Sequence, residues 1–171
     1  MTSQKLVVVS GLPGSGKSTI ADGVSRALSV PVFSIDPIEA AMWRNGIAKN
    51  QTGIAAYEVA AALAGQHLRL GHSAIIDAVN PIEAPRAGWR ALAAKYQAEL
   101  KVIECVCASE ATHRQRIEAR RRNIDGMPEI PWSRVLERRA EYEPWTDQRL
   151  TLDTSGGTPE SLLADVLNYL C

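Results

Sequence analysis

The sequence predicts an α/β fold in which a parallel five-stranded sheet lies between two layers of helices. Two observations support this prediction: short apolar runs alternate with stretches of helical periodicity, and a glycine-rich turn directly follows the first apolar run. Such alternation is typical of a three-layer sandwich with helices on both faces of the sheet. The runs are continuously apolar rather than alternating in polarity, which favours strands that are buried on both faces.

The first expected strand covers residues 5–10, K-L-V-V-V-S, where β-branched residues predominate. After the glycine-rich turn, apolar residues recur at helical spacing between residues 17 and 28 and predict the first helix. Residues 31–35 form the second expected strand, and a second helix is expected to begin near Pro37. The opening of the chain therefore reads as strand, helix, strand.

The remaining strands are expected at residues 74–76, 102–106 and 149–152, and alanine-rich helices at 53–70 and 82–98. A last helix, residues 159–170, is expected to begin at Pro159 with Thr158 as its N-cap. Between about residues 109 and 145 the pattern changes to basic helices that a polar, proline-bearing loop interrupts. We expect this segment to form a helical lid on a single domain that spans residues 1–171.

The composition limits the classes of function. Lysine and arginine total 19, as do aspartate and glutamate, so the formal net charge is zero, which disfavours a broad nucleic-acid surface. The three cysteines suggest neither a disulfide framework nor a four-ligand metal site. No secretory leader and no apolar run of about 18 residues is evident, so we expect a cytoplasmic protein without a membrane segment, either a monomer or a homodimer.

The segment G-L-P-G-S-G-K-S-T, residues 11–19, matches the phosphate-binding pattern G-x-x-x-x-G-K-[ST] and lies between an expected strand and helix. Glycines let backbone N–H groups converge on phosphate oxygens, and the helix N-terminus adds partial positive charge. We expect Lys17 to reach the β- and γ-phosphates of ATP and Ser18 to bind Mg²⁺. The residues expected to contact ATP here are Gly11, Pro13, Gly14, Ser15, Gly16, Lys17, Ser18 and Thr19. The fold class is therefore that of a P-loop NTPase.

Asp77 ends the apolar run A-I-I-D, so its carboxylate is expected at the carboxyl edge of a strand beside the phosphate loop. A carboxylate there can hold a magnesium-bound water or accept a hydrogen bond from Ser18. The alternative is that Asp77 merely begins a loop. Position 78 is alanine, so the Asp-Glu pair of many motor ATPases is absent.

Asp36 follows the second expected strand and is our candidate general base, because a carboxylate at this edge could accept the proton of an attacking hydroxyl. The sequence D-P-I-E also suits a capping box, with Asp36 as N-cap and Glu39 as its partner. Asn80 opens a similar N-P-I-E sequence and is either a substrate contact or an N-cap. Glu39 and Arg44 are further substrate-side candidates.

The expected lid carries the sequence H-R-Q-R-I-E-A-R-R-R, in which Arg116 and Arg120 share a helical face and Arg122 lies near the end. Phosphoryl transfer depends on positioning and on neutralising negative charge, so we expect at least one of these arginines to meet phosphate. Arg120 is our catalytic candidate among them. The alternative is a solvated, charged helix face.

With these motifs the sequence resembles small P-loop kinases that include polynucleotide 5′-hydroxyl kinases, zeta-toxin-type kinases and chloramphenicol 3-O-phosphotransferase. The motifs are the phosphate loop, S-I-D at residues 34–36, G-H-S-A-I-I-D-A-V-N at 71–80 with Arg86 downstream, and R-I-E-A-R at 116–120. The resemblance implies that Asp36 acts as the general base and that Arg116 and Arg120 contact the ATP phosphates.

One departure concerns the acceptor. Polynucleotide kinases carry D-x-x-R after this strand, whereas in this chain the first arginine after Asp36 is Arg44. Together with the zero net charge, this favours phosphate transfer to a hydroxyl of a small molecule such as a nucleoside, sugar or antibiotic. The alternatives are a polynucleotide 5′-hydroxyl kinase and an ATP-binding clamp or switch without an acceptor.

Overall fold

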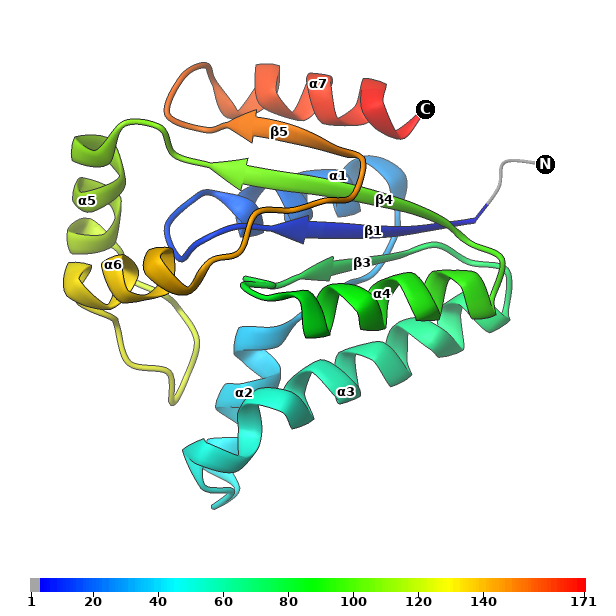
Figure 1. Cartoon of the computed structure of the whole chain (residues 1–171), viewed down its shortest axis with the longest axis horizontal. Coiled ribbons are helices and arrows are strands. Elements are labelled where there is room, and N and C mark those ends of the chain that lie inside the picture. Colours follow the sequence, from blue (N-terminus) through cyan, green and yellow to red (C-terminus); the bar gives the residue numbers. More distant parts are fainter. Residues whose placement is uncertain (1–3) are drawn as a thin grey trace.

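The computed structural model describes residues 4–171, which form a five-stranded parallel sheet with the strand order β2-β3-β1-β4-β5 (Figure 1). The strands are β1 (Lys5–Ser10), β2 (Val32–Ser34), β3 (Ala74–Asp77), β4 (Glu99–Val106) and β5 (Arg149–Asp153). The helices are α1 (Lys17–Leu28), α2 (Ile35–Arg44), α3 (Lys49–Arg69), α4 (Glu83–Lys95), α5 (Glu110–Ala119), α6 (Trp132–Glu141) and α7 (Pro159–Leu170). The predicted fold class is confirmed.

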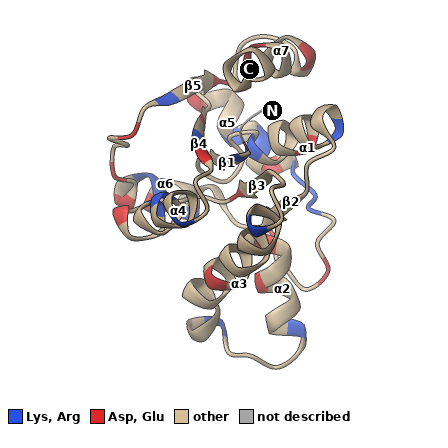
Figure 2. Ribbon diagram, turned by 90° about the vertical axis from the view of Figure 1, so that its right-hand side faces the viewer, with Lys and Arg blue, Asp and Glu red and all other residues tan. Residues whose placement is uncertain are grey.

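Successive residues of β1 supply the two cores of the sandwich. Leu6 and Val8 pack with residues of α3 and α4, whereas Val7 and Val9 pack with residues of α1 and α7. All four side chains are buried, as expected for a central parallel strand. Figure 2 views the molecule from the side and shows α1 and α7 together, apart from α3 and α4.

The start of α2 differs from the prediction. The strand before it ends at Ser34 and the helix begins at Ile35, two residues before Pro37. Ile35 is buried in the core beside α3, and this packing starts the helix early. Asp36 therefore lies inside the first turn and is not the N-cap, so the predicted capping box is wrong. The carboxylate of Glu39 instead accepts a hydrogen bond from Thr52 Oγ1 at 2.8 Å.

The predicted capping role of Asn80 is also wrong. Helix α4 begins at Glu83 with Ile82 in the N-cap position. Asn80 has a left-handed backbone (φ 50°) and is fully buried, and its Oδ1 accepts a hydrogen bond from Trp89 Nε1 at 2.8 Å. Its amide side chain holds the loop after β3 against α4. By contrast, the predicted cap at Thr158 is confirmed, because its side chain accepts a hydrogen bond from the backbone N–H of Ser161.

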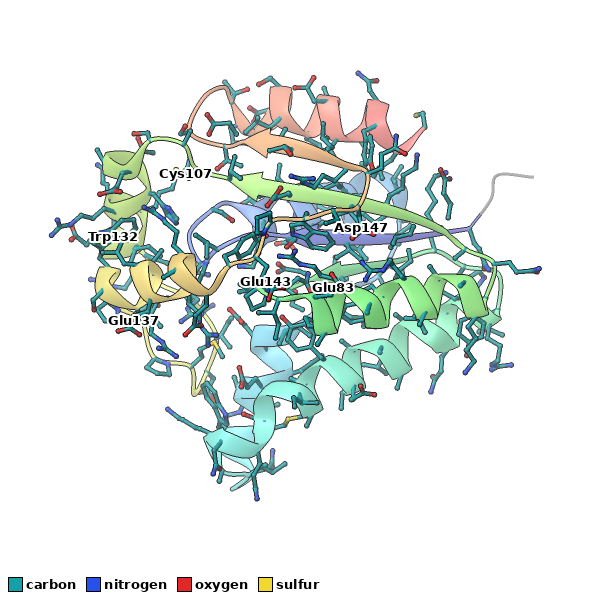
Figure 3. All side chains as sticks on the ribbon, in the orientation of Figure 1. Glu83, Cys107, Trp132, Glu137, Glu143 and Asp147 are labelled. Atoms are coloured by element: carbon teal, nitrogen blue, oxygen red, sulfur yellow. The ribbon has the colours of Figure 1, made fainter. Side chains whose placement is uncertain are left out.

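Helices α5 and α6 and the loop between them lie beyond the carboxyl ends of the strands (Figure 1). The segment after α6 returns across the start of α4, where Figure 3 shows Glu83, Glu143 and Asp147 close together. Arg86, fully buried, anchors this crossing with hydrogen bonds to the carbonyls of Glu143 (2.7 Å) and Pro144 (2.9 Å). Within residues 4–171, no helix is long and apolar enough to cross a membrane.

Candidate nucleotide and acceptor site

The phosphate loop, residues 11–16, leaves the carboxyl end of β1 and passes close to α5. Gly14 and Gly16 adopt positive φ angles of 79° and 88°, which favour glycine. A Cβ on Gly14 would lie 2.7 Å from Ile117 Cδ1 of α5. The loop therefore needs glycine both for its backbone conformation and for its approach to the lid.

Lys17 begins α1 and is only 5% exposed. In the described part of the chain, residues 4–171, no carboxylate lies within ion-pair distance of its ammonium group. Buried charges are normally paired, so this cation is suited to an anionic ligand. It lines a cavity of about 420 Å³ with residues from the phosphate loop, the lid and the start of α7. The cavity lining includes Gly14, Gly16, Ser18, Thr19, Arg116, Arg120, Thr154 and Gly157.

The candidate metal ligands lie beside this cavity. Asp77 ends β3 in register with Val9 of β1 and with Ser34 of β2. Its Oδ2 accepts a hydrogen bond from Ser34 Oγ at 3.1 Å, whereas its buried Oδ1 has no hydrogen-bond partner among the described residues. An orphaned carboxylate oxygen fits a magnesium-bound water, and Ser18 lines the same cavity. Asp77 and Ser18 therefore offer oxygen atoms of the kind that would hold a Mg²⁺ ion.

The candidate base, Asp36, contacts the lid directly. Its Oδ2 lies 2.9 Å from Arg122 Nη1, and the Arg122 side chain is only 7% exposed against 33% for Asp36. Arg122 Nη2 also donates to the carbonyl of Pro128 at 2.8 Å. Arg122, which was one of the three arginines expected to contact ATP phosphates, thus binds the candidate base and the lid loop instead.

The other two lid arginines line the nucleotide cavity. Arg116 donates two hydrogen bonds to Thr154, at 2.8 Å to Oγ1 and at 2.6 Å to the carbonyl oxygen. Arg120 follows the end of α5, and its buried Nη1 has no hydrogen-bond partner within residues 4–171. Burial and, next, the neighbouring Arg122 cation lower the pKa of Arg120. Both features indicate a guanidinium that an anion would stabilise.

The structure adds two residues that the sequence analysis missed. Thr154 Oγ1 donates to the carbonyl of Ser15 at 2.7 Å and so connects the end of β5 to the phosphate loop. His113 Nε2 lies 2.7 Å from the carbonyl of Pro13, and burial lowers the pKa of His113. Trp132 of α6 packs edge-on against the His113 ring, with centroids 5.1 Å apart. The position of Thr154 just after a parallel strand was a usable signal, whereas His113 opens the basic lid sequence, in which only the arginines were considered.

The remaining candidates for substrate contact lie in different environments. Arg44 is exposed and binds Asp125 of the lid loop through the backbone carbonyl and, at 3.7 Å, the carboxylate. Glu39 lies on α2 one turn after Asp36, with its carboxylate bonded to Thr52. Asn80 exposes no surface to a substrate. The structure therefore places Asp36, Glu39 and Arg44 on one helix and leaves Asn80 in the core.

Comparison with solved structures supports the fold. A putative kinase from Chloroflexus aurantiacus J-10-fl superposes with a TM-score of 0.77 at 20% identity, covering 100% of both chains. A sugar kinase from Janibacter sp. HTCC2649 gives 0.72 at 21% identity (98% of this chain, 94% of that chain). The Mycobacterium tuberculosis APS kinase CysC in complex with AMPPNP and APS gives 0.68 at 21% identity, covering 98% of both chains. At these identities the similarity shows a shared fold.

Sequence comparison gives the family. Three uncharacterized proteins, from Mycobacterium bovis and two strains of Mycobacterium tuberculosis, are 27% identical over 170 residues that cover 92% of this chain. The chain spans only 33% of the length of these relatives. The AAA domain family AAA_33 matches residues 6–145, a range that includes the phosphate loop, Asp36, Asp77 and the lid arginines. This chain therefore belongs to the AAA domain family AAA_33 and has the fold of P-loop kinases.

Proposed function

We propose that this chain is an ATP-dependent phosphotransferase that moves the γ-phosphate of Mg-ATP onto a hydroxyl of a small molecule. One observation carries the proposal: two cations without an acidic partner among residues 4–171, buried Lys17 and half-buried Arg120, line one cavity. The carboxylate of Asp36 lies two residues after a strand that pairs with the Asp77 strand. The two cations can bind the negatively charged phosphates of ATP. The Asp36 carboxylate can accept the proton that the attacking hydroxyl loses. We propose residues 1–171 as one kinase domain with a lid at about 109–145.

Each of the side chains at the site has a separate role in the proposed reaction. Asp36 accepts the proton of the acceptor hydroxyl, whose oxygen forms a bond to the γ-phosphorus while the bond from that phosphorus to the ADP oxygen breaks. Lys17, Arg116 and Arg120 bind phosphate oxygens and offset their charge. Ser18 and Asp77 would hold Mg²⁺, which would offset negative charge on the phosphates. Arg122 has to leave Asp36 before the carboxylate can take a proton, so lid movement and proton transfer are linked.

Two observations favour a small acceptor over a polynucleotide. Arg116 and Arg122 bind groups of the chain itself, Thr154 and Asp36, and so do not form an exposed basic groove. Basic and acidic residues are interspersed over the helices (Figure 2), consistent with the zero net charge. The sugar kinase and APS kinase among the fold relatives support the same class of acceptor.

The test is ATP consumption by the purified protein with Mg²⁺ against sugars, sugar acids, nucleosides, aminoglycoside and phenicol antibiotics, and 5′-hydroxyl oligonucleotides. We expect one small molecule to accelerate consumption and to gain one phosphate by mass spectrometry. Acceleration by oligonucleotides alone would establish the polynucleotide kinase instead. Tight ATP binding with no accelerating compound would favour the ATP-binding clamp.

A further inference from the structure

Thr154 lies in the turn that follows β5. Its backbone N–H donates to the carbonyl of Val106 at 2.8 Å, which extends the pairing of β5 with β4 by one residue. The carboxylate of Asp153 holds the same turn, because its Oδ1 accepts hydrogen bonds from the backbone N–H groups of Ala108 (3.1 Å) and Ser155 (2.9 Å). Thr154 is only 5% exposed. Its side chain is therefore buried and starts from a backbone that is held on both sides.

The hydroxyl group of Thr154 joins the phosphate loop to the lid. Its Oγ1 donates to the carbonyl of Ser15 at 2.7 Å and accepts a hydrogen bond from Nη1 of Arg116 at 2.8 Å. The carbonyl of Val106 lies farther from Oγ1, at 3.1 Å, so we assign the single hydroxyl hydrogen to Ser15. A hydroxyl can donate one hydrogen bond and accept another, so one group serves both partners at the same time.

The bond to Ser15 also fixes a donor of the phosphate loop. A trans peptide unit is planar, so holding the Ser15 carbonyl sets the direction of the N–H group of Gly16 in the same unit. Gly16 lines the nucleotide cavity. It also packs closely on Thr154, because a Cβ on Gly16 would lie 3.3 Å from both Cγ2 and Oγ1 of Thr154. The methyl and hydroxyl groups of Thr154 therefore hold this peptide unit together.

The bonds to Arg116 orient a cation without neutralising it. Oγ1 and the carbonyl oxygen of Thr154 are both uncharged acceptors, so the charge of the guanidinium stays available to an anion. Nη1 of Arg116 also donates to Cys107 Sγ at 3.7 Å. A guanidinium has five N–H donors, and Nε of Arg116 donates to no group within residues 4–171. Arg116, which lines the nucleotide cavity, thus keeps donors for phosphate oxygens.

We propose that Thr154 is a positioning residue of the nucleotide site. It holds the Gly16 N–H group and the Arg116 guanidinium in the arrangement that binds the phosphates of ATP. This inference rests on the proposed function and adds a residue to it. Donors that are already in place bind more tightly, because their ordering costs no further free energy when the ligand arrives. Loss of the hydroxyl would release both donors and leave the Ser15 carbonyl without its partner.

The experiment is calorimetric titration of the whole chain with AMPPNP in the presence of Mg²⁺. Thr154→Val removes the hydroxyl, whereas Thr154→Ser keeps it. We expect Thr154→Val to weaken AMPPNP binding by about 10- to 100-fold, the range for a hydrogen bond to a charged group. Thr154→Ser should retain most of the affinity. The matched control is Thr151→Val, the same change at an exposed position of β5, which should have no effect.

Further variants separate positioning from stability. Arg116→Lys keeps the charge but not the two bonds to Thr154, so it should also lose AMPPNP affinity while Thr154 is left in place. In the double variant Thr154→Val/Arg116→Lys, the total loss should be smaller than the product of the two single losses, because Thr154 acts in part through Arg116. A purely structural role of Thr154 would lower the melting temperature and give losses that multiply.

The inference is overturned if Thr154→Val binds AMPPNP as well as Thr151→Val does, if Thr154→Ser loses as much affinity as Thr154→Val, or if the losses multiply in the double variant. Such a result, together with phosphate transfer to a small acceptor, would leave the proposed function standing. A loss of affinity in Thr154→Val that Thr154→Ser does not share, in a protein that phosphorylates no acceptor, would support the inference and defeat the phosphotransfer. The two failures are thus distinguishable.

Discussion

Arg122 Nη1 lies 2.9 Å from the carboxylate oxygen Oδ2 of Asp36, a contact between residues 86 positions apart in the chain. This ion pair joins the lid loop to the first turn of α2. While it is formed, one carboxylate oxygen of the candidate base is bound to the lid loop. A second contact, between Arg44 and Asp125, joins the same two segments. In the proposed reaction, the contact between Arg122 and Asp36 has to open before the Asp36 carboxylate can accept a proton, so movement of the lid loop would release the base.

The first prediction concerns Asp36→Asn. We expect this variant to keep its ATP affinity and to lose a factor of roughly 10² to 10⁴ in transfer rate, the usual contribution of a general base. Asp36 caps no helix, but it pairs with the largely buried Arg122, so the free energy of unfolding should fall by about 1–3 kcal/mol. Single-turnover kinetics and urea unfolding measure the two effects, with Glu58→Gln on α3 as a control. A full transfer rate in Asp36→Asn would refute the assignment.

The second prediction concerns Lys17→Ala. The ammonium group pairs with no carboxylate within residues 4–171, so its removal should weaken AMPPNP binding by roughly a hundredfold or more without lowering the melting temperature. Calorimetric titration and thermal unfolding check these outcomes, with Lys95→Ala at the end of α4 as a control. Unchanged nucleotide affinity in Lys17→Ala would show that the cavity beside the phosphate loop is not the nucleotide site.

The third prediction separates stability from binding at Arg120. Its buried Nη1 lacks a hydrogen-bond partner among the described residues, so Arg120→Met should leave the ligand-free protein as stable or stabilise it by up to about 1–3 kcal/mol. The same change should weaken ATP binding by about 10- to 100-fold, because a charged hydrogen bond to phosphate is lost. Arg121→Met, an exposed neighbour, is the control. A loss of stability with unchanged ATP affinity would mean that Arg120 has only a structural role.

The fourth prediction concerns pH. Burial lowers the pKa of His113 below 6.5, its ordinary value, so the unfolded chain binds a proton more readily than the native protein. The stability due to neutral His113 is therefore complete above about pH 6.5 and falls as the pH drops through the folded pKa. His113→Gln retains an N–H donor for the Pro13 carbonyl but does not titrate. We expect urea unfolding from about pH 8 to about pH 5 to show a shallower decline in this variant; an identical decline would contradict the prediction.

Local patterns in the sequence predicted most of the framework. The continuous apolar runs predicted the parallel strands, and G-x-x-x-x-G-K-S predicted the turn between β1 and α1, because both depend on neighbours within a few residues. The capping signatures of D-P-I-E and N-P-I-E failed for the opposite reason. Burial of Ile35 and the bond between Asn80 and Trp89 are tertiary interactions, and they overrode the local preference for a cap.

The sequence by itself determined the α/β fold, the phosphate loop and the position of two carboxylates at strand ends, Asp77 as the last residue of β3 and Asp36 shortly after β2. Parallel strands bring these ends to one edge of the sheet. Only the tertiary structure decided which lid arginine meets which group. Arg116, Arg120 and Arg122 look alike in sequence, yet Arg116 binds Thr154 and Arg122 binds Asp36, whereas the buried Nη1 of Arg120 has no hydrogen-bond partner within residues 4–171. Long, flexible side chains take the partners that folding brings within reach, and those partners lie far away along the chain.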